Sequence, residues 1–151
     1  MLQEFTYVKP EDVSDYWQLV GPILKKATDV SEGRYSISDL KERCESGAFQ
    51  LWLVIDNGRV NAALTFSISI FPQKRILSIH YLGGEMMKDW IAPLADFMQR
   101  MTLVQQCDGL EFVGRPGWEK VVAPFGFRKA FVHYIQGADE IRTAVGNRGN
   151  A

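Results

Sequence analysis

The feature that most constrains the fold is a pair of segments with a period of two, joined by a tight turn. Residues 49–55 (FQLWLVI) and 60–71 (VNAALTFSISIF) flank the sequence Asp56, Asn57 and Gly58. Asn-Gly favours the positive backbone angles that a tight hairpin requires. One side of the second segment is apolar and the other carries hydroxyl groups, so we expect a hairpin that covers a hydrophobic core with one face.

The other apolar patterns predict a single α/β domain around this hairpin. A chain of 151 residues is long enough for one core. The pattern predicts the order strand, two helices, three strands, helix, strand, helix, strand, and the domain is expected to span residues 1–137. Residues 138–151 are expected to be a tail, with a short edge strand and then frayed ends. The other predicted strands are 2–9, 76–82, 110–114 and 130–136, and the predicted helices begin near residues 13, 36, 89 and 118.

Charge and composition argue against several classes of partner. The chain has 17 Lys and Arg against 18 Asp and Glu, a net charge of -1, so no general attraction to nucleic acid or anionic lipid is expected. No apolar run approaches the ~20 residues of a membrane span, which predicts a cytoplasmic protein. Cys44 and Cys107 lie in apolar patterns and are expected to be reduced, buried thiols. His80 and His133 lie on separate predicted strands, so no metal site is predicted.

The element order and the ending PFGFRKAFVHYI (124–135) suggest a family. Both resemble the GNAT superfamily of acyl-CoA-dependent N-acyltransferases. The sequence GRPGW (114–118) with the later Gly-Phe is similar to short GNAT-like proteins of phages and prophages. The resemblance implies a mixed, mostly antiparallel sheet of about six strands with four flanking helices. It also implies acetyl-CoA as the acyl donor and no metal.

The same resemblance places an acyl-CoA site where the fourth strand splays from the fifth. Carried over by position, the strand end and phosphate turn are Tyr81, Leu82, Gly83 and Gly84, and Arg115 lies at the mouth of the fifth strand. The chain departs from the family here, because the usual Gln/Arg-x-x-Gly-x-Gly/Ala motif is absent. The two glycines therefore either approach a phosphate or form a structural turn. Arg115 either faces the cofactor or pairs with a helix carboxylate.

Three residues are candidates for acid–base catalysis. His80, at the end of the predicted fourth strand, is the first candidate for the general base, and Glu111 on the fifth strand is the second. Many family members carry a proton-donating Tyr at the position of Val122, which cannot donate. Tyr134 on the last predicted strand is the substitute candidate. Each of the three has a structural alternative, as a packed or solvent-facing side chain of a strand.

Two functions follow from the resemblance. The first is an acyl-CoA-dependent N-acyltransferase that acetylates a small-molecule or protein amine. The second is a catalytically silent protein with the same fold, such as a virion-associated phage component or an assembly subunit. Beside the resemblance, we expect the family's usual final strand to be missing and a sheet edge to be left open, covered either by residues 139–145 or by another copy in a homo-oligomer.

Overall fold

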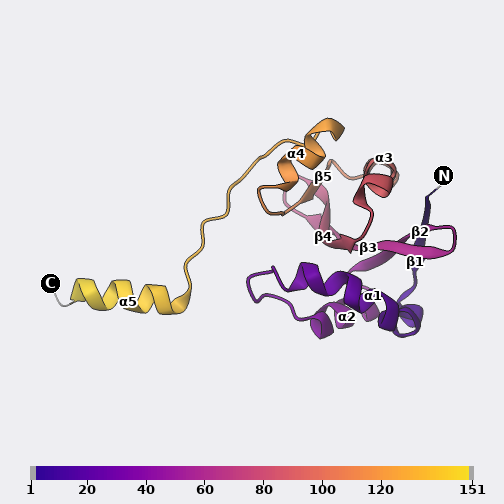
Figure 1. Ribbon diagram of the computed structural model, residues 1–151. Coiled ribbons are helices and arrows are strands. Elements are labelled where there is room, and N and C mark those ends of the chain that lie inside the picture. Colours follow the sequence, from indigo (N-terminus) through magenta and orange to yellow (C-terminus); the bar gives the residue numbers. More distant parts are fainter. Residues whose placement is uncertain (1–2, 150–151) are drawn as a thin grey trace. The chain divides into compact units, whose positions relative to one another are not determined.

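The protein is described by a computed structural model that covers residues 3–149. The chain divides into two compact units: the first ends at Arg115 and the second begins at Pro116. The first unit contains the whole β-sheet and is shown with the rest of the chain in Figure 1.

The sheet of the first unit has five strands in the order β1-β2-β3-β4-β5. Neighbouring strands are antiparallel except β4 and β5, which are parallel. The mixed, mostly antiparallel sheet predicted from the sequence is therefore confirmed, with five strands in the described residues where about six were expected. The strands are β1 (Glu4–Val8), β2 (Gln50–Asp56), β3 (Arg59–Ile70), β4 (Arg75–Gly84) and β5 (Gly109–Phe112).

The predicted hairpin is formed by β2 and β3. Asn57 and Gly58 have φ values of 51° and 76°, and Asp56 pairs with Arg59 across the turn. Both turn residues thus adopt the positive angles expected of Asn-Gly, which fixes the register of the two strands.

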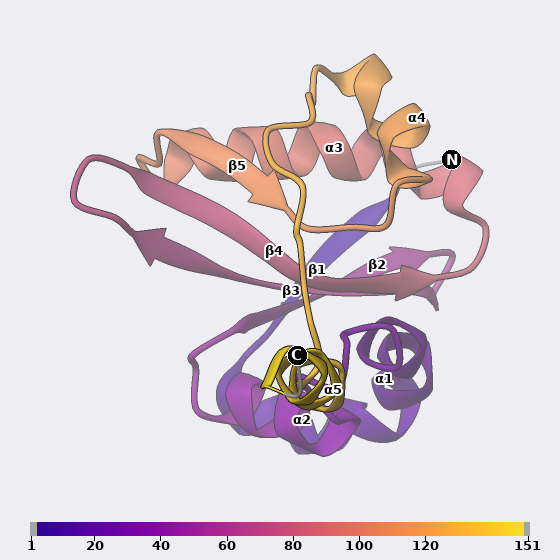
Figure 2. The same ribbon diagram turned by 90° about the vertical axis from the view of Figure 1, so that its left-hand side faces the viewer.

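Helices cover both faces of the sheet, as Figure 2 shows. Helices α1 (Val13–Thr28) and α2 (Ile37–Glu45) lie on one face, and α3 (Met87–Val104) lies on the other. A short 3-10 helix, η1 (Pro10–Asp12), precedes α1.

Each side of the sheet has its own hydrophobic core. We call the core beneath α1 and α2 the first core and the core beneath α3 the second core. Cys44 lies in the first and Cys107 in the second, and both thiols are free and buried, as expected. The first core includes Val13, Val20, Leu24, Leu40, Leu51 and Leu53; the second includes Val54, Leu64, Phe66, Leu77, Trp90 and Met98.

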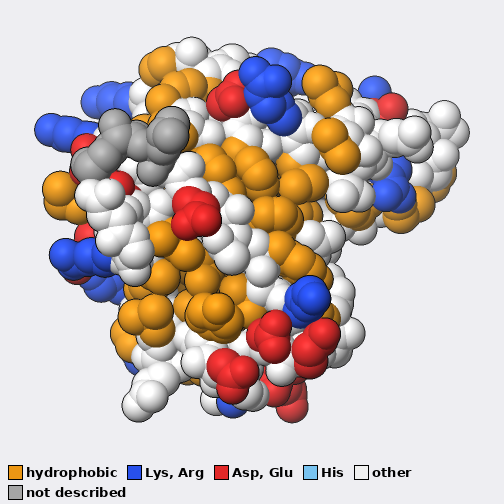
Figure 3. All heavy atoms as spheres, turned by 90° about the vertical axis from the view of Figure 1, so that its right-hand side faces the viewer, with side chains coloured by type: hydrophobic (Ala, Val, Ile, Leu, Met, Phe, Trp, Pro, Cys, Tyr) orange, Lys and Arg blue, Asp and Glu red, His pale blue; other side chains and the backbone are white. Residues whose placement is uncertain are grey.

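Some hydrophobic side chains remain at the surface of the first unit. Leu19 is 52% exposed and Tyr7 is 41% exposed. Figure 3 shows one face of the molecule, with hydrophobic side chains gathered across its middle. Within residues 3–149, no helix is long and apolar enough to cross a bilayer.

The second unit is helical and differs from the expectation for the chain's end. It contains α4 (Trp118–Val122), the 3-10 helix η2 (Ala123–Phe125) and α5 (Ala138–Gly149). Gly126, with φ 92°, closes η2. The Lys129 ammonium lies 3.3 Å from the Glu119 carboxylate.

Two predictions for this region are wrong. Residues 130–136, predicted to be a strand, have no regular structure. Residues 139–145 lie in α5, so they supply no edge strand. Two acidic residues in the first turn of α5 suit the positive end of a helix, and Asp139 forms an ion pair with Arg142 one turn later.

Candidate functional site

A β-bulge in β4 determines how His80 is presented. Ser78 pairs with Ser67 and Ile79 with Phe66, but the next pair joins Tyr81 to Thr65. His80 is therefore an extra residue in β4, and the alternation of side chains is interrupted there. His80 stacks on Phe49 with ring centroids 4.2 Å apart, and both Tyr81 and Phe49 pack against the first core. Two successive side chains of β4 thus point to the face covered by α1 and α2.

Five polar side chains around this bulge form what we call the β4 cluster: Ser67, Ser69, Ser78, His80 and Glu111. The hydroxyl oxygen of Ser67 lies 2.6 Å from Nε2 of His80, and the tautomer of His80 decides which atom donates. The Ser78 hydroxyl donates to Oε1 of Glu111 over 2.8 Å and lies 2.8 Å from the Ser69 hydroxyl. Three strands therefore contribute to two neighbouring hydrogen-bonded groups, Ser67 with His80 and Ser69 with Ser78 and Glu111.

The environment of the β4 cluster favours an uncharged His80. Burial lowers the pKa of His80 below its usual value, and the nearby charge of Glu111 opposes this shift in part. A neutral imidazole has a free nitrogen lone pair at neutral pH. His80 is therefore in the protonation state that a general base requires.

The two parallel strands separate close to His80. The pairing of β4 with β5 ends at Ile79 and Phe112, whereas β4 continues to Gly84. Backbone groups of β4 that point towards β5 beyond Ile79 therefore have no partner in that strand. Such an edge offers hydrogen-bonding groups to an extended ligand that carries amides of its own. Tyr81 and Leu82 lie on this part of β4.

Close packing accounts for the two glycines at the end of β4. A Cβ atom on Gly83 would lie 2.3 Å from the carbonyl oxygen of Ile23, and one on Gly84 would lie 2.4 Å from that of Asn61. The N–H of Glu85 donates to the same Asn61 oxygen over 2.9 Å. The structural alternative thus explains both glycines, and their proposed contact with phosphate stays a prediction.

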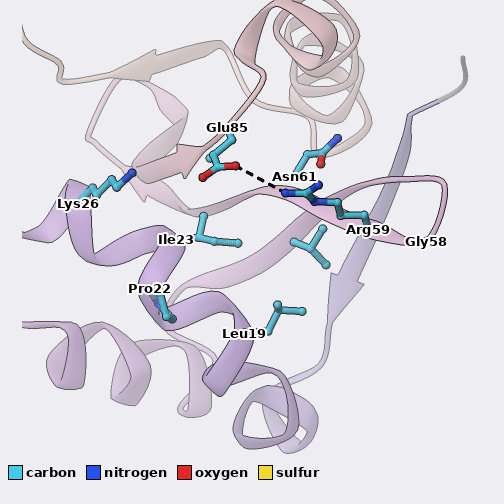
Figure 4. Close-up of a pocket in the computed structure, with 10 residues that line it drawn as sticks. Leu19, Pro22, Ile23, Lys26, Gly58, Arg59, Asn61 and Glu85 are labelled. Carbon is cyan, nitrogen blue, oxygen red and sulfur yellow. Dashed lines mark ion pairs between the residues drawn. The ribbon is translucent and has the colours of Figure 1, made fainter.

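A separate pocket of about 630 Å³ lies at the far end of β4. Its walls come from α1, from the turn between β2 and β3, and from the end of β4 (Figure 4). Arg59 and Glu85 form an ion pair across it at 3.7 Å. Gly84 is the one predicted site residue that lines this pocket, and no member of the β4 cluster does.

The structure brings together two of the predicted catalytic residues, His80 and Glu111. Arg115, at the end of the first unit, is exposed. Tyr134 belongs to the second unit and is 91% exposed, so its role as proton donor stays a prediction. Among residues 3–149, no group of three or more His, Cys, Asp or Glu side chains gathers as metal ligands do.

Sequence reasoning missed Ser67, Ser69 and Phe49 as neighbours of the candidate base. The alternation in 60–71 does put the two serines on one face of β3. Their contact with β4 depends on the pairing register and on the bulge, neither of which has a local sequence signature.

No family model matches the sequence, and no curated protein matches it. Solved structures do resemble the fold, at low identity. An aminoglycoside acetyltransferase from an uncultured soil metagenomic sample is 12% identical, with 91% of this chain and 99% of that chain covered and a TM-score of 0.68. A ribosomal-protein-alanine N-acetyltransferase from Brucella melitensis is 11% identical. The match covers 90% of this chain and 99% of that chain, with a TM-score of 0.68.

A third match is a predicted acetyltransferase from Clostridium acetobutylicum, solved with acetyl-CoA. It is 15% identical, with 92% of this chain and 98% of that chain covered and a TM-score of 0.65. These comparisons show that the chain has the fold of GNAT acetyltransferases, as the sequence resemblance implied. The fold alone does not define the reaction, because function depends on the site.

Proposed function

We propose that the protein is an acetyl-CoA-dependent N-acetyltransferase. The observation that carries the proposal is the position of the bulge: His80 lies beside the point at which β4 leaves β5. A neutral histidine next to an open strand edge places a base beside backbone groups that can pair with an extended, amide-containing ligand. The fold shared with acetyltransferases, one of them solved with acetyl-CoA, supports this reading.

The exposed edge of β4 suits the pantetheine arm of acetyl-CoA. The amides of that arm would pair with the backbone of Tyr81 and Leu82, beyond the last pair with β5. Because the N–H of Glu85 already donates to Asn61, the diphosphate would need other donors. The N–H groups of Met87 and Lys88 at the start of α3 and the guanidinium of Arg115 are the groups we assign to it.

The β4 cluster would supply the proton transfer. A cationic acceptor first loses one proton to solvent. The neutral amine nitrogen then attacks the thioester carbonyl, His80 accepts the second proton that the nitrogen loses, and the C–S bond breaks to release CoA as a thiolate. The thiolate then takes up a proton from solvent to give the thiol. The Ser67 hydroxyl, 2.6 Å from Nε2, would hold the imidazole in one orientation.

The acceptor we propose is a cationic amine of a small molecule or a protein. Glu111 is exposed and carries a negative charge next to the proposed base, which would attract an ammonium group. A neighbour in fold is an aminoglycoside acetyltransferase, so polyamine antibiotics are sensible first probes.

Calorimetric titration with acetyl-CoA and with CoA tests the proposal first. We expect micromolar binding, weakened about tenfold or more by Arg115→Ala because a charge-assisted contact is lost. Lys74→Ala, which removes an exposed cation from the turn between β3 and β4, is the matched control and should bind as the parent does.

Thiol release in the presence of an aminoglycoside and of simple polyamines then tests the chemistry. We expect turnover to fall by roughly 10²-fold or more in His80→Gln, while acetyl-CoA binding is retained. If the folded protein binds neither ligand at millimolar concentration, the proposal is wrong and the silent scaffold, including the phage-component alternative, takes its place.

A further inference from the structure

The pocket at the end of β4 is separate from the proposed catalytic site, so a role for it does not depend on the proposed function. Its volume of about 630 Å³ lies within the roughly 300–1,000 Å³ that small-molecule sites occupy. It lies on the β3 side of β4, because its walls include the β2–β3 turn and the first residues of β3. The edge of β4 proposed for acetyl-CoA faces β5, the other neighbour of β4. The pocket can therefore hold a ligand of its own.

The backbone around this pocket is held by hydrogen bonds and close packing. The N–H of Glu85 donates to the carbonyl of Asn61 over 2.9 Å, and the carbonyl of Glu85 accepts a hydrogen bond from the Trp90 indole over 2.6 Å. A Cβ atom on Gly84 would lie 2.4 Å from the same Asn61 carbonyl, so the two segments are in direct contact. The pocket is thus formed before any ligand arrives, as small-molecule sites usually are.

One side of α1 forms the apolar wall of the pocket. Pro22 and Ile23 follow Leu19 by three and four residues, so the three side chains share one side of the helix. Val60 of β3 also lines the pocket, and Figure 4 shows Leu19 and Ile23 projecting from α1 into it. Leu19 remains 52% exposed. An apolar ligand would remove these side chains from water, which favours binding.

The rim of the pocket carries two cations and one carboxylate. Lys26 and Arg59 line it together with Glu85, which leaves an excess of one positive charge. The side chains of Arg59 and Glu85 are 77% and 72% exposed and lie 3.7 Å apart, beyond the roughly 2.7–2.9 Å of a charge-assisted hydrogen bond. Exposed ion pairs of this kind contribute little to stability. An incoming carboxylate can therefore take the place of Glu85 on the guanidinium at little cost.

We propose that this pocket binds a small amphipathic carboxylate, a molecule with one carboxylate group and an apolar body. The planar guanidinium of Arg59 holds both carboxylate oxygens, and Lys26 adds a second positive charge. The apolar body lies against Leu19 and Ile23. A single negative charge matches the lining, because Glu85 stays at the rim and would repel a dianion such as a phosphate monoester.

Calorimetric titration of the full chain with phenylbutyrate tests the site. Phenylbutylamine, which has the same apolar body and the opposite charge, is the control ligand and should bind about tenfold more weakly or worse. Arg59→Ala should raise the dissociation constant of phenylbutyrate about tenfold or more, because a charge-assisted contact is lost. Lys26→Ala should also weaken binding, whereas Lys25→Ala, which removes the neighbouring cation that pairs with Asp29 outside the pocket, should not.

Glu85→Gln should change the affinity in the opposite direction. The substitution removes the competing partner of Arg59 and the repulsion of the ligand, so phenylbutyrate should bind about threefold more tightly or better. Binding should also shift the amide signals of Arg59 and Glu85 in nitrogen-15 NMR spectra. No binding at millimolar concentration, equal affinity in the parent and Arg59→Ala, or tighter binding of the amine would overturn the proposal. Since these titrations contain no acetyl-CoA, their outcome is independent of acetyl transfer.

Discussion

At the scale of single residues, His80 combines features that local sequence does not connect. It is the extra residue of a bulge, it stacks on Phe49, and it contacts the Ser67 hydroxyl. Partial burial favours its neutral form over the imidazolium. This places a proton acceptor in the molecule whether or not acetyl transfer is its task, and it also makes folding sensitive to pH.

The protein should therefore become less stable as the pH is lowered, partly because of His80. Its pKa in the folded state is below the ordinary 6.5, so between the two values the unfolded chain holds more protons than the folded one. The free energy of unfolding then decreases as pH falls through that window, by at most about 1.4 kcal/mol per pH unit from this group. In His80→Gln this part of the slope should be absent.

Urea unfolding at about pH 5 and about pH 8 measures the effect on either side of the histidine titration. Ser69→Ala is the matched control, because it alters the β4 cluster at a residue whose hydroxyl contacts Ser78 rather than His80. The parent and the control should show the same difference between the two pH values, and His80→Gln a smaller one. An equal difference in all three proteins would contradict the assigned shift in pKa.

At the scale of elements, α2 shows how a local signal and a distant contact combine. The N–H of Asp39 donates to the Ser36 hydroxyl over 3.1 Å, and the N–H of Ser36 donates to the Asp39 carboxylate over 2.9 Å. Hydrogen bonds from Ser36 lower the pKa of Asp39. This capping box holds the start of a nine-residue helix that buries Leu40 and Cys44 in the first core.

Ser36→Ala should destabilise the protein by about 1 kcal/mol, because it leaves the N–H of Asp39 without its partner at the start of α2. Ser38→Ala is the control, an exposed serine within the same helix, and it should leave stability unchanged or raise it slightly. Chemical denaturation of the two variants provides the comparison. Equal stabilities would mean that packing alone, without the cap, holds α2 in place.

Elements with local signals could be predicted from the sequence, and those that depend on distant partners could not. The Asn57-Gly58 turn and the Ser36 cap follow from neighbouring residues, and both are present. Residues 130–136 have an equally clear strand pattern, but a strand forms only when another strand pairs with it. The bulge at His80 and the approach of Gly83 to the Ile23 carbonyl likewise depend on parts of the chain far away in sequence.

At the scale of the whole molecule, one sheet joins two cores in the first unit. The first core uses Leu51, Leu53 and Ala63 of β2 and β3, while the second uses Val54 and Leu64 of the same strands. Neither core can lose these strands without exposing the other. The two cores should therefore unfold together, as small domains with a shared core layer do.

The two cysteines report on this coupling, because Cys44 lies in the first core and Cys107 in the second. Burial raises the pKa of the Cys44 thiol to about 12, so native protein should react with an alkylating reagent only after unfolding. Pulses of reagent along a urea gradient, with each thiol quantified by mass spectrometry, should give coincident midpoints for the two sites.

Leu24→Ala, which opens a cavity in the first core alone, should lower both midpoints together and reduce the free energy of unfolding by about 2–5 kcal/mol. Midpoints that separate, or a shift confined to Cys44, would show that the sheet does not couple the cores.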